Sequence, residues 1–179
     1  MPAYHSKFNE CVELQVGNMA VLPIKTNFKG PAPRKDDHAE DIIDEALLYF
    51  KPNIFFRQFE IKGSADRTLI YLMLYIIECL KRLQKGQKKT EAIKDLTTMA
   101  LSSKLPIPGE VSFPFQGLFK PPANGQEEET MRAYLQQLRQ ELGARLCERV
   151  FLIPDAPASK WWLCFARRRF MDKALSQTM

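Results

Sequence analysis

TLIYLMLYIIECL, residues 68–80, contains the longest apolar run of the chain. With Ser64 as the N-cap, the pattern predicts a helix that reaches about Leu83. Its apolar side chains cover nearly every face, and a helix that is apolar all round must be surrounded by other elements. A membrane span needs about 20 apolar residues, whereas this run is closed by Arg67 and Glu78. We therefore expect a central, buried core helix and no membrane span.

Three further helices with one apolar face each are predicted around this segment. The first starts near Asp36, where acidic residues suit the positive end of a helix dipole, and ends at Pro52. The second runs from Thr90 to about Leu101, and the third covers residues 126–151. The apolar stripe of the third consists of Met131, Leu135, Leu138, Leu142, Leu146 and Val150. Its opposite side carries Gln136, Arg139, Gln140 and Arg149.

The remaining segments are rich in proline and aromatic residues. Residues 1–35 are expected to form an extended, irregular arm that packs on the helical body through its apolar side chains. Residues 104–125 contain five of the twelve prolines together with several aromatic residues, and they predict an ordered loop, because flexible linkers lack aromatic residues. NIFFRQFEI, residues 53–61, fits either a short strand or a short helix. Ser159 is a plausible N-cap for a short last helix.

These elements predict a mainly all-α fold. We expect a multi-helical single domain over residues 1–179, with one central apolar helix surrounded by others and an irregular, proline-rich N-terminal arm and loop. A chain of this length usually forms one domain. Hydrophobic residues make up 45% and charged residues 26%, a globular balance that argues against disorder.

The charge and cysteine content set only weak limits on function. The chain has 26 basic and 21 acidic residues, a formal net charge of +5, which mildly favours acidic partners but also suits an ordinary solvated surface. Its cysteines are far apart in the sequence and form no CxxC pair, which argues against a zinc cluster. They are Cys11, Cys79, Cys147 and Cys164. MPAYHSKFNE at the N-terminus lacks an apolar region, so we expect no signal peptide and a cytoplasmic, reducing environment.

The sequence offers little that could carry catalysis. Its two histidines, His5 and His38, have no motif partners and are interpreted as surface residues. Neither a nucleotide-binding glycine motif nor a GxSxG nucleophile motif occurs. We therefore predict a protein that is not an enzyme and that binds no metal or cofactor.

Two basic clusters are the candidate interaction sites. KWWLCFARRRF, residues 160–170, combines aromatic and basic side chains, so it fits a core segment, a protein interface, or a surface for nucleic acid or membrane. The second cluster follows the central helix. The candidate residues are Lys81, Arg82, Lys85, Lys88, Lys89, Lys160, Arg167, Arg168, Arg169 and Lys173. A solvated charged face explains both clusters equally well.

Five stretches together resemble one known family. They are GNMAVLPI with FKGPAP, ADRTLIYLMLYIIECL, PIPGE, MRAYLQQLRQELGARLCERVF and SKWWLCFARRRFMDKAL. The chain resembles the subunit 3 (21-kDa subunit) family of the actin-related protein 2/3 complex from about Met1 to Leu175. Three positions depart from the expected pattern, namely Pro52, Ala158 and the apolar pair Leu152–Ile153. They bear on local loop geometry only.

The resemblance implies a multi-helical, non-catalytic subunit with one helix surrounded by the others. In that family the subunit packs chiefly against actin-related protein 3 and lies near the mother actin filament, while the actin-related subunits bind ATP. It further implies partners among the other subunits, no nucleic acid, and a place in the cytoplasmic cytoskeleton of actin-rich projections. The alternative is a small basic nucleic-acid-binding module that uses the C-terminal Trp/Arg segment, residues 160–170.

Overall fold

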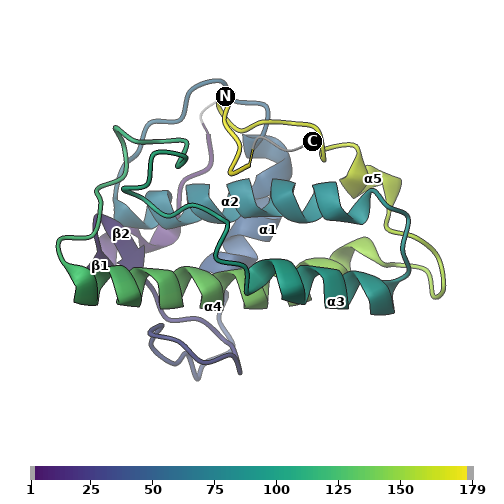
Figure 1. Ribbon diagram of the computed structural model, residues 1–179, viewed down its shortest axis with the longest axis horizontal. Helices are drawn as coiled ribbons and strands as arrows, with labels where there is room; N and C mark the ends of the chain where they lie inside the picture. The colour runs from purple at the N-terminus through teal and green to yellow at the C-terminus, as the bar shows by residue number, and fades with distance from the viewer. Residues whose placement is uncertain (1–2, 177–179) are drawn as a thin grey trace.

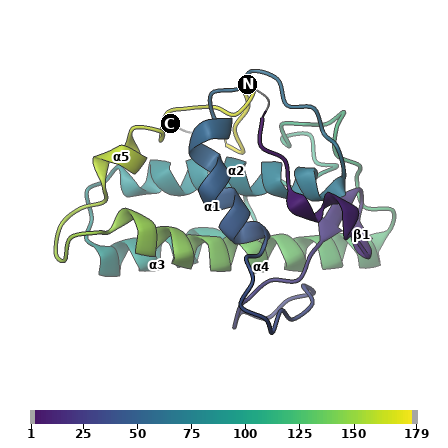
Figure 2. The same cartoon turned by 180° about the vertical axis from the view of Figure 1, so that it is seen from behind.

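The computed structural model describes residues 3–176, which form a mostly helical structure with one small sheet (Figures 1 and 2). In chain order the elements are the 3-10 helix η1 (Lys7–Glu10), β1 (Leu14–Val16), β2 (Met19–Val21), α1 (Ile42–Asn53), α2 (Ser64–Leu83), α3 (Lys89–Ala100), α4 (Gly125–Val150) and α5 (Lys160–Leu163). The predicted mainly helical fold agrees with this architecture. The small sheet was not predicted.

Helix α2 lies where the apolar run predicts it, and 17 of its 20 residues are buried. It packs against α1, α3, α4, α5, η1 and β2. Figure 1 shows α2 running alongside α4, and Figure 2 shows α1 crossing in front of α2. The N-cap is Gly63, which makes no side-chain cap, so Ser64 is the first helical residue and not the cap as predicted.

Helices α3 and α4 also begin and end within one residue of the predicted positions. All six residues of the predicted apolar stripe of α4 are buried. Arg139, placed by the sequence on the polar side, is buried as well. Its Nε donates to the carbonyl oxygen of Ala100 at 3.0 Å and its Nη1 to the hydroxyl of Tyr71 at 3.0 Å. Arg139 therefore joins α4 to both α2 and α3.

Helix α1 differs from its prediction at both ends. It begins at Ile42 behind Asp41, whose side chain accepts from the Asp44 amide while the Asp44 side chain accepts from the Asp41 amide. This capping box marks the start of the helix, so the acidic residues before it lie outside the helix. There the Ala39 amide donates to the Asp37 side chain in a local turn. Pro52 was expected to end the helix but lies in its last turn, and the helix continues past it only to Asn53.

The N-terminal arm is more regular than predicted. β1 and β2 form an antiparallel hairpin, with Leu14 opposite Val21 and Val16 opposite Met19. Gly17 makes the turn with a φ of +61°, and a Cβ at this position would lie 2.5 Å from the carbonyl oxygen of Lys120. Only glycine satisfies both conditions without strain. Of the apolar arm residues, Met19, Val21, Leu22 and Ile24 are buried as expected, whereas Phe28 is exposed.

Two buried carboxylates anchor the start of the arm. Asp66 accepts from the amide of Ser6 at 2.8 Å and lies 2.7 Å from His5 Nδ1. Glu45 accepts from the hydroxyl of Ser6 at 2.7 Å and from the amide of Lys7 at 2.8 Å. His5 is thus half-buried against a carboxylate and is not the surface residue predicted.

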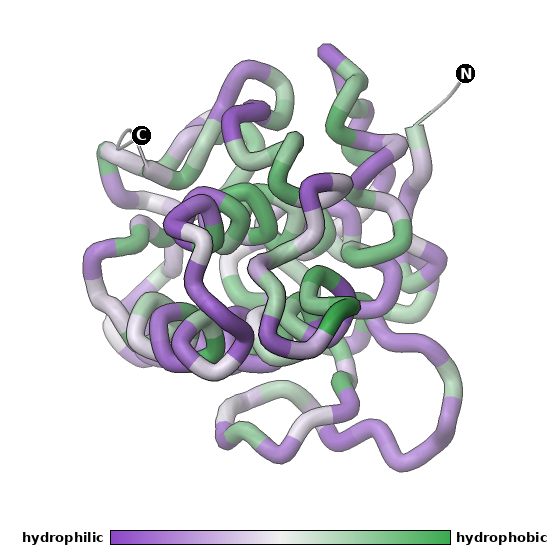
Figure 3. Tube along the Cα trace, turned by 90° about the vertical axis from the view of Figure 1, so that its right-hand side faces the viewer, coloured by the Kyte–Doolittle hydropathy of each residue, from purple (hydrophilic) through white to green (hydrophobic). Residues whose placement is uncertain are grey.

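The long loop between α3 and α4 is ordered on the helical body. It has no helix or strand, yet its apolar residues Leu105, Ile107, Phe113, Phe115 and Phe119 are buried. Residues 54–61 form neither the strand nor the helix considered for them. Figure 3 shows apolar residues gathered within the helices, while the loop between β2 and α1, which projects below α4 in Figure 1, is largely hydrophilic.

Candidate interaction surfaces

The C-terminal segment separates its two tryptophans. Ser159 caps α5 as predicted, its hydroxyl accepting from the Trp161 amide. Successive residues of a helix point about 100° apart, so one ring can enter the core while its neighbour faces outward. Trp162 is 8% exposed and Trp161 is 69% exposed. Trp162 therefore fits the interpretation of this segment as part of the core, and Trp161 fits its interpretation as an interaction surface.

An aromatic cluster connects the core to this surface. Trp162 stacks on Phe50 with ring centroids 6.2 Å apart, and Lys51 Nζ lies 4.2 Å from the Trp162 ring. Phe165 packs edge-on to Phe50 at 5.7 Å and to Phe55 at 5.9 Å. Phe55 is 57% exposed, although nothing in its short segment indicated a functional residue. The cluster thus ends in a large apolar side chain that faces outward.

Basic side chains surround these exposed rings. The Arg168 guanidinium lies 4.8 Å from the Phe55 ring and Lys160 Nζ lies 5.2 Å from the Trp161 ring. Within residues 3–176, neither the exposed Arg167 nor the exposed Arg169 has an ion-pair partner. We name Phe55, Lys160, Trp161, Arg167, Arg168 and Arg169 the C-terminal surface.

Lys173, the last predicted member of this cluster, follows a tight turn. Its amide donates to the carbonyl oxygen of Phe170 at 2.9 Å, and the Phe170 amide donates back to the Lys173 carbonyl at 3.0 Å. The Lys173 side chain is exposed. Trp and Arg are enriched at the energetic centres of protein interfaces, so the composition of the C-terminal surface suits protein binding.

The second predicted basic cluster is divided between two hollows. Lys81, Arg82 and Lys85 line one pocket at the end of α2. Lys88 and Lys89 line another, together with Leu152 and Ile153. Lys89 is already paired with Glu148 on α4 at 2.8 Å. The structure therefore does not gather all five residues into one site.

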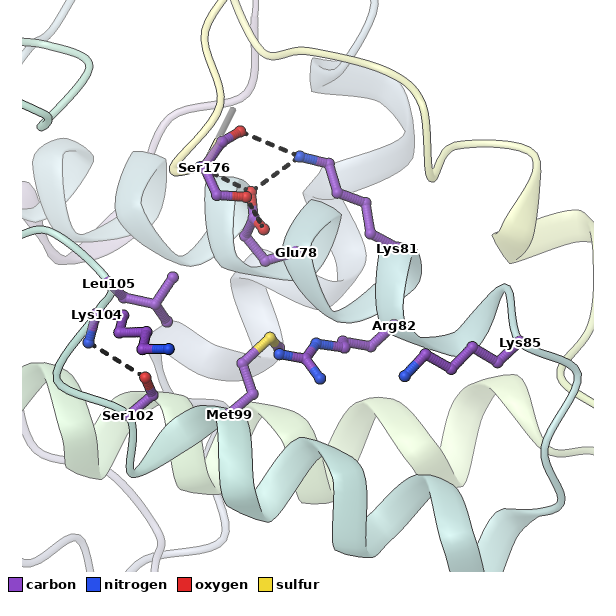
Figure 4. A pocket seen from close by; sticks show the side chains of 9 residues that line it. All are labelled: Glu78, Lys81, Arg82, Lys85, Met99, Ser102, Lys104, Leu105 and Ser176. Carbon is purple, nitrogen blue, oxygen red and sulfur yellow. Dashed lines mark hydrogen bonds and ion pairs between the residues drawn. The ribbon is translucent and has the colours of Figure 1, made fainter. Parts of the chain in front are cut away.

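The pocket beside α2 has a volume of about 510 Å³ (Figure 4). Besides the three predicted residues, its lining consists of Glu78, Met99, Ser102, Lys104, Leu105 and Ser176. These residues come from α2, the end of α3, the following loop and the C-terminal segment. Sequence reasoning missed them because they are up to 98 positions apart and share no local pattern. We name this hollow the basic pocket.

Burial favours the neutral forms of several cysteine and tyrosine side chains. Burial raises the pKa of the Cys147 thiol to about 11, and burial likewise raises the pKa of the Cys79 thiol. Burial also raises the pKa of Tyr71 and Tyr75. A protonated thiol is a weak nucleophile, so these groups are suited to packing. In the described part of the chain, no three His, Cys, Asp or Glu side chains gather as a metal site, and no helix is long and apolar enough to cross a membrane.

Comparison with known proteins identifies the family. A family model described as P21-Arc, the ARP2/3 complex ARPC3 (21 kDa) subunit, matches residues 1–175. The chain belongs to this family. Three relatives of the 21-kDa subunit family are similar over nearly their whole length. "Probable actin-related protein 2/3 complex subunit 3" of Caenorhabditis elegans is 62% identical over 98% of this chain and 96% of its own.

Two further relatives agree with this assignment. "Actin-related protein 2/3 complex subunit 3" of Schizosaccharomyces pombe is 49% identical over 98% of this chain and 100% of its own. The protein of the same name from Dictyostelium discoideum is 49% identical over 96% of this chain and 99% of its own. The sequence-based assignment to the 21-kDa subunit family is therefore confirmed.

The three positions at which we expected a departure from the family pattern lie at a helix end or in a loop. Pro52 is accommodated in the last turn of α1, and Ala158 is buried. Leu152 and Ile153 are both largely exposed beside the hollow that contains Lys88 and Lys89.

Proposed function

We propose that the chain is a non-catalytic structural subunit of the actin-related protein 2/3 complex. The observation that carries this proposal is the family match, which spans residues 1–175. The relatives named above are subunit 3 of that complex. In this role the chain contributes to actin filament nucleation and branching by binding other proteins and needs no cofactor of its own.

Within the complex, we propose that the chain binds actin-related protein 3 and the mother filament. The exposed rings of Phe55 and Trp161 supply apolar area for a partner, and Trp is a frequent anchor at protein interfaces. The arginines beside them have no ion-pair partner in the described structure, so an acidic partner surface would meet charges that are free to pair. This role places the chain in the cytoplasm, in actin-rich projections.

Two double variants separate the contact with actin-related protein 3 from the contact with the mother filament. Phe55→Ser with Trp161→Ser is expected to reduce co-purification with actin-related protein 3, because apolar contact area is lost. Arg167→Glu with Arg168→Glu is expected to leave the complex assembled but to lower branch density severalfold in an imaging assay with purified complex. Lys94→Glu, a charge reversal at an exposed residue of α3, is the matched control. Normal branching by a folded arginine variant would remove this surface from the filament contact.

The rival function is binding of nucleic acid through residues 160–170. The exposed Trp161 with its neighbouring arginines is the feature that such a module would use for stacking and phosphate contact. Fluorescence anisotropy with labelled single-stranded DNA at several salt concentrations tests it. Binding that falls steeply with salt and is lost in Trp161→Ala would favour this rival over the structural subunit.

A further inference from the structure

The segment before η1 is held to the helical body through backbone groups. The Asn53 side chain accepts from the Tyr4 amide and donates to the Tyr4 carbonyl oxygen, each at 2.9 Å. The Asp66 carboxylate accepts from the Ser6 amide at 2.8 Å. Main-chain hydrogen bonds are a general means by which a protein binds an extended peptide. The N-terminal segment is therefore held as a receptor would hold a peptide ligand.

A serine and a histidine add side-chain contacts to the same two helices. The Ser6 hydroxyl donates to one oxygen of Glu45 at 2.7 Å, and the Lys7 amide donates to the other oxygen at 2.8 Å. His5 Nδ1 lies 2.7 Å from Asp66 Oδ2. The negative charge of two buried carboxylates is thus matched by donors that come from three consecutive residues of the segment.

These contacts are polar, and little apolar area supports them. The helical residues that hold the segment are at most 2% exposed, and we name them the seat: Glu45, Asn53 and Asp66. The segment contacts the core with three partly buried side chains, Ala3, Phe8 and Val12. Water can replace hydrogen bonds to the seat, whereas it cannot replace a buried apolar contact. The segment can therefore leave the seat while the helical core stays folded.

The hairpin sets the limit of such a release. Val16, Met19 and Ala20 are at most 1% exposed, and β2 packs against α2. Figure 2 shows the start of the chain passing beside α1 before it reaches β1. Release up to the hairpin would free residues 3–12 together and would uncover two carboxylates and one amide side chain on α1 and α2.

We propose that residues 3–12 form a releasable strap, and that the seat beneath it binds an extended segment of a partner when the strap is open. The partner segment carries a serine with positively charged neighbours, because the seat offers two carboxylates and an amide to hydroxyl and backbone donors. The strap and the partner segment exclude each other. The proposal does not rest on the role of the chain in a complex.

The sequence of the strap supplies the probe for a binding test. A fluorescein-labelled peptide of residues 3–10, AYHSKFNE, is added to the full chain and followed by fluorescence anisotropy. In the wild type the strap competes as a tethered copy, so binding is expected to be weak. Ser6→Ala removes a hydrogen bond to a carboxylate from the strap but not from the probe. The affinity for the probe is therefore expected to rise roughly tenfold.

A second probe, with alanine in place of its serine, shows whether the peptide occupies the seat. On the Ser6→Ala chain, the alanine probe is expected to bind roughly tenfold more weakly than the serine probe. That preference should disappear in the double variant Ser6→Ala with Glu45→Leu, because the acceptor of the serine hydroxyl is gone. Equal affinity of the two probes for the Ser6→Ala chain would indicate unspecific binding and overturn the proposal.

Hydrogen exchange tests the release itself. The amides of Tyr4, Ser6 and Lys7 are expected to exchange at one common rate that exceeds the rate of the α2 amides. Exchange of all these amides at the rate of α2 would show that the strap opens only when the whole fold unfolds. This result would overturn the proposal as well.

Two controls keep the binding result interpretable. Ser103→Ala, the same change at an exposed serine outside the strap, is expected to alter probe affinity less than about twofold. Circular dichroism shows whether each variant is folded, and His5→Ala replaces Ser6→Ala if that variant is not. The assay contains no other subunit, so its failure leaves the proposed subunit function untouched.

Discussion

Arg145 holds Asp41 through two hydrogen bonds, with Nη1 and Nη2 each 2.7 Å from one oxygen of the carboxylate. The two residues are 104 positions apart, and Asp41 is 0% exposed. Arg145 Nη2 also donates to the carbonyl oxygen of Lys25 at 2.6 Å. One guanidinium on α4 thus fixes both the N-cap of α1 and the arm that leads to it. A paired geometry of this kind is among the strongest that side chains form.

Removal of this guanidinium should destabilise the fold strongly. Arg145→Met keeps much of the side-chain length but leaves the Asp41 carboxylate buried without a cation. Breaking a buried pair from one side costs about 3–5 kcal/mol. Urea unfolding at neutral pH measures the loss. Arg149→Met, at an exposed position on the same helix, is the control and should change stability by less than about 0.5 kcal/mol. Similar losses in both variants would contradict this role of Arg145.

The same pair predicts how stability depends on pH. Burial by itself would raise the pKa of the Asp41 carboxyl, but the hydrogen bonds from Arg145 outweigh it and hold that pKa below its ordinary value. The contribution of Asp41 is therefore present above about pH 4, its ordinary range, and is lost as the pH falls through the lower pKa of the folded state. Asp41→Asn should be less stable than the wild type at pH 7, and the difference should shrink in acid.

Urea unfolding of both proteins from pH 7 to pH 3 measures this difference. Glu45 acts in the opposite sense, because burial raises its pKa and its contribution is largest in acid and declines as the pH rises. Comparison of Asp41→Asn with the wild type cancels the Glu45 contribution, since both proteins contain Glu45. A difference that stays constant over the whole range would show that the Asp41 charge does not stabilise the fold.

The adjacent tryptophans should respond differently to the same substitution. Trp162→Ala removes a buried ring that stacks on Phe50, and such a change costs about 3–5 kcal/mol of stability. Trp161→Ala alters an exposed ring and should stay within about 0.5 kcal/mol. Thermal or urea unfolding of the two variants provides a matched comparison. A larger loss of stability in Trp161→Ala than in Trp162→Ala would contradict the assignment of Trp162 to the core and Trp161 to the surface.

Asp66 should control the attachment of the N-terminal arm. Its carboxylate accepts from the amides of Ser6 at 2.8 Å and Lys62 at 3.0 Å. Asp66→Asn replaces one acceptor oxygen by a donor, and loss of a hydrogen bond to a charged group costs about 1.5–3 kcal/mol. Hydrogen exchange of the Ser6 amide should therefore accelerate roughly tenfold or more. Asp172→Asn, at an exposed position, should leave that rate unchanged.

Much of the helical structure could be predicted from local patterns. The all-apolar run predicts α2, and the stripe from Met131 to Val150 predicts α4, because helical periodicity and end signals lie within a few residues of each other. The start of α1 could not be predicted in the same way. Several acidic residues precede it, and which of them becomes the N-cap depends on the position of Arg145.

For the candidate surfaces, the sequence predicted which residues take part but not how they are arranged in space. KWWLCFARRRF indicates a segment that can bind a partner, but its pattern does not show which tryptophan enters the core. The basic run after α2 indicates a cationic surface, but not that Lys88 and Lys89 lie apart from it. Phe55 and Lys104 carry no local signal at all. They become part of a surface only through the segments that pack beside them.

The sequence by itself determined the mainly helical class, the limits of the longest helices and membership of the 21-kDa subunit family. These properties depend on backbone hydrogen bonds and side-chain spacing within a few residues. The tertiary structure alone decided that Arg145 meets Asp41, that Arg139 is buried, and that Arg82 and Lys104 share a pocket. Such contacts join distant positions, and their geometry is set by packing of the whole core.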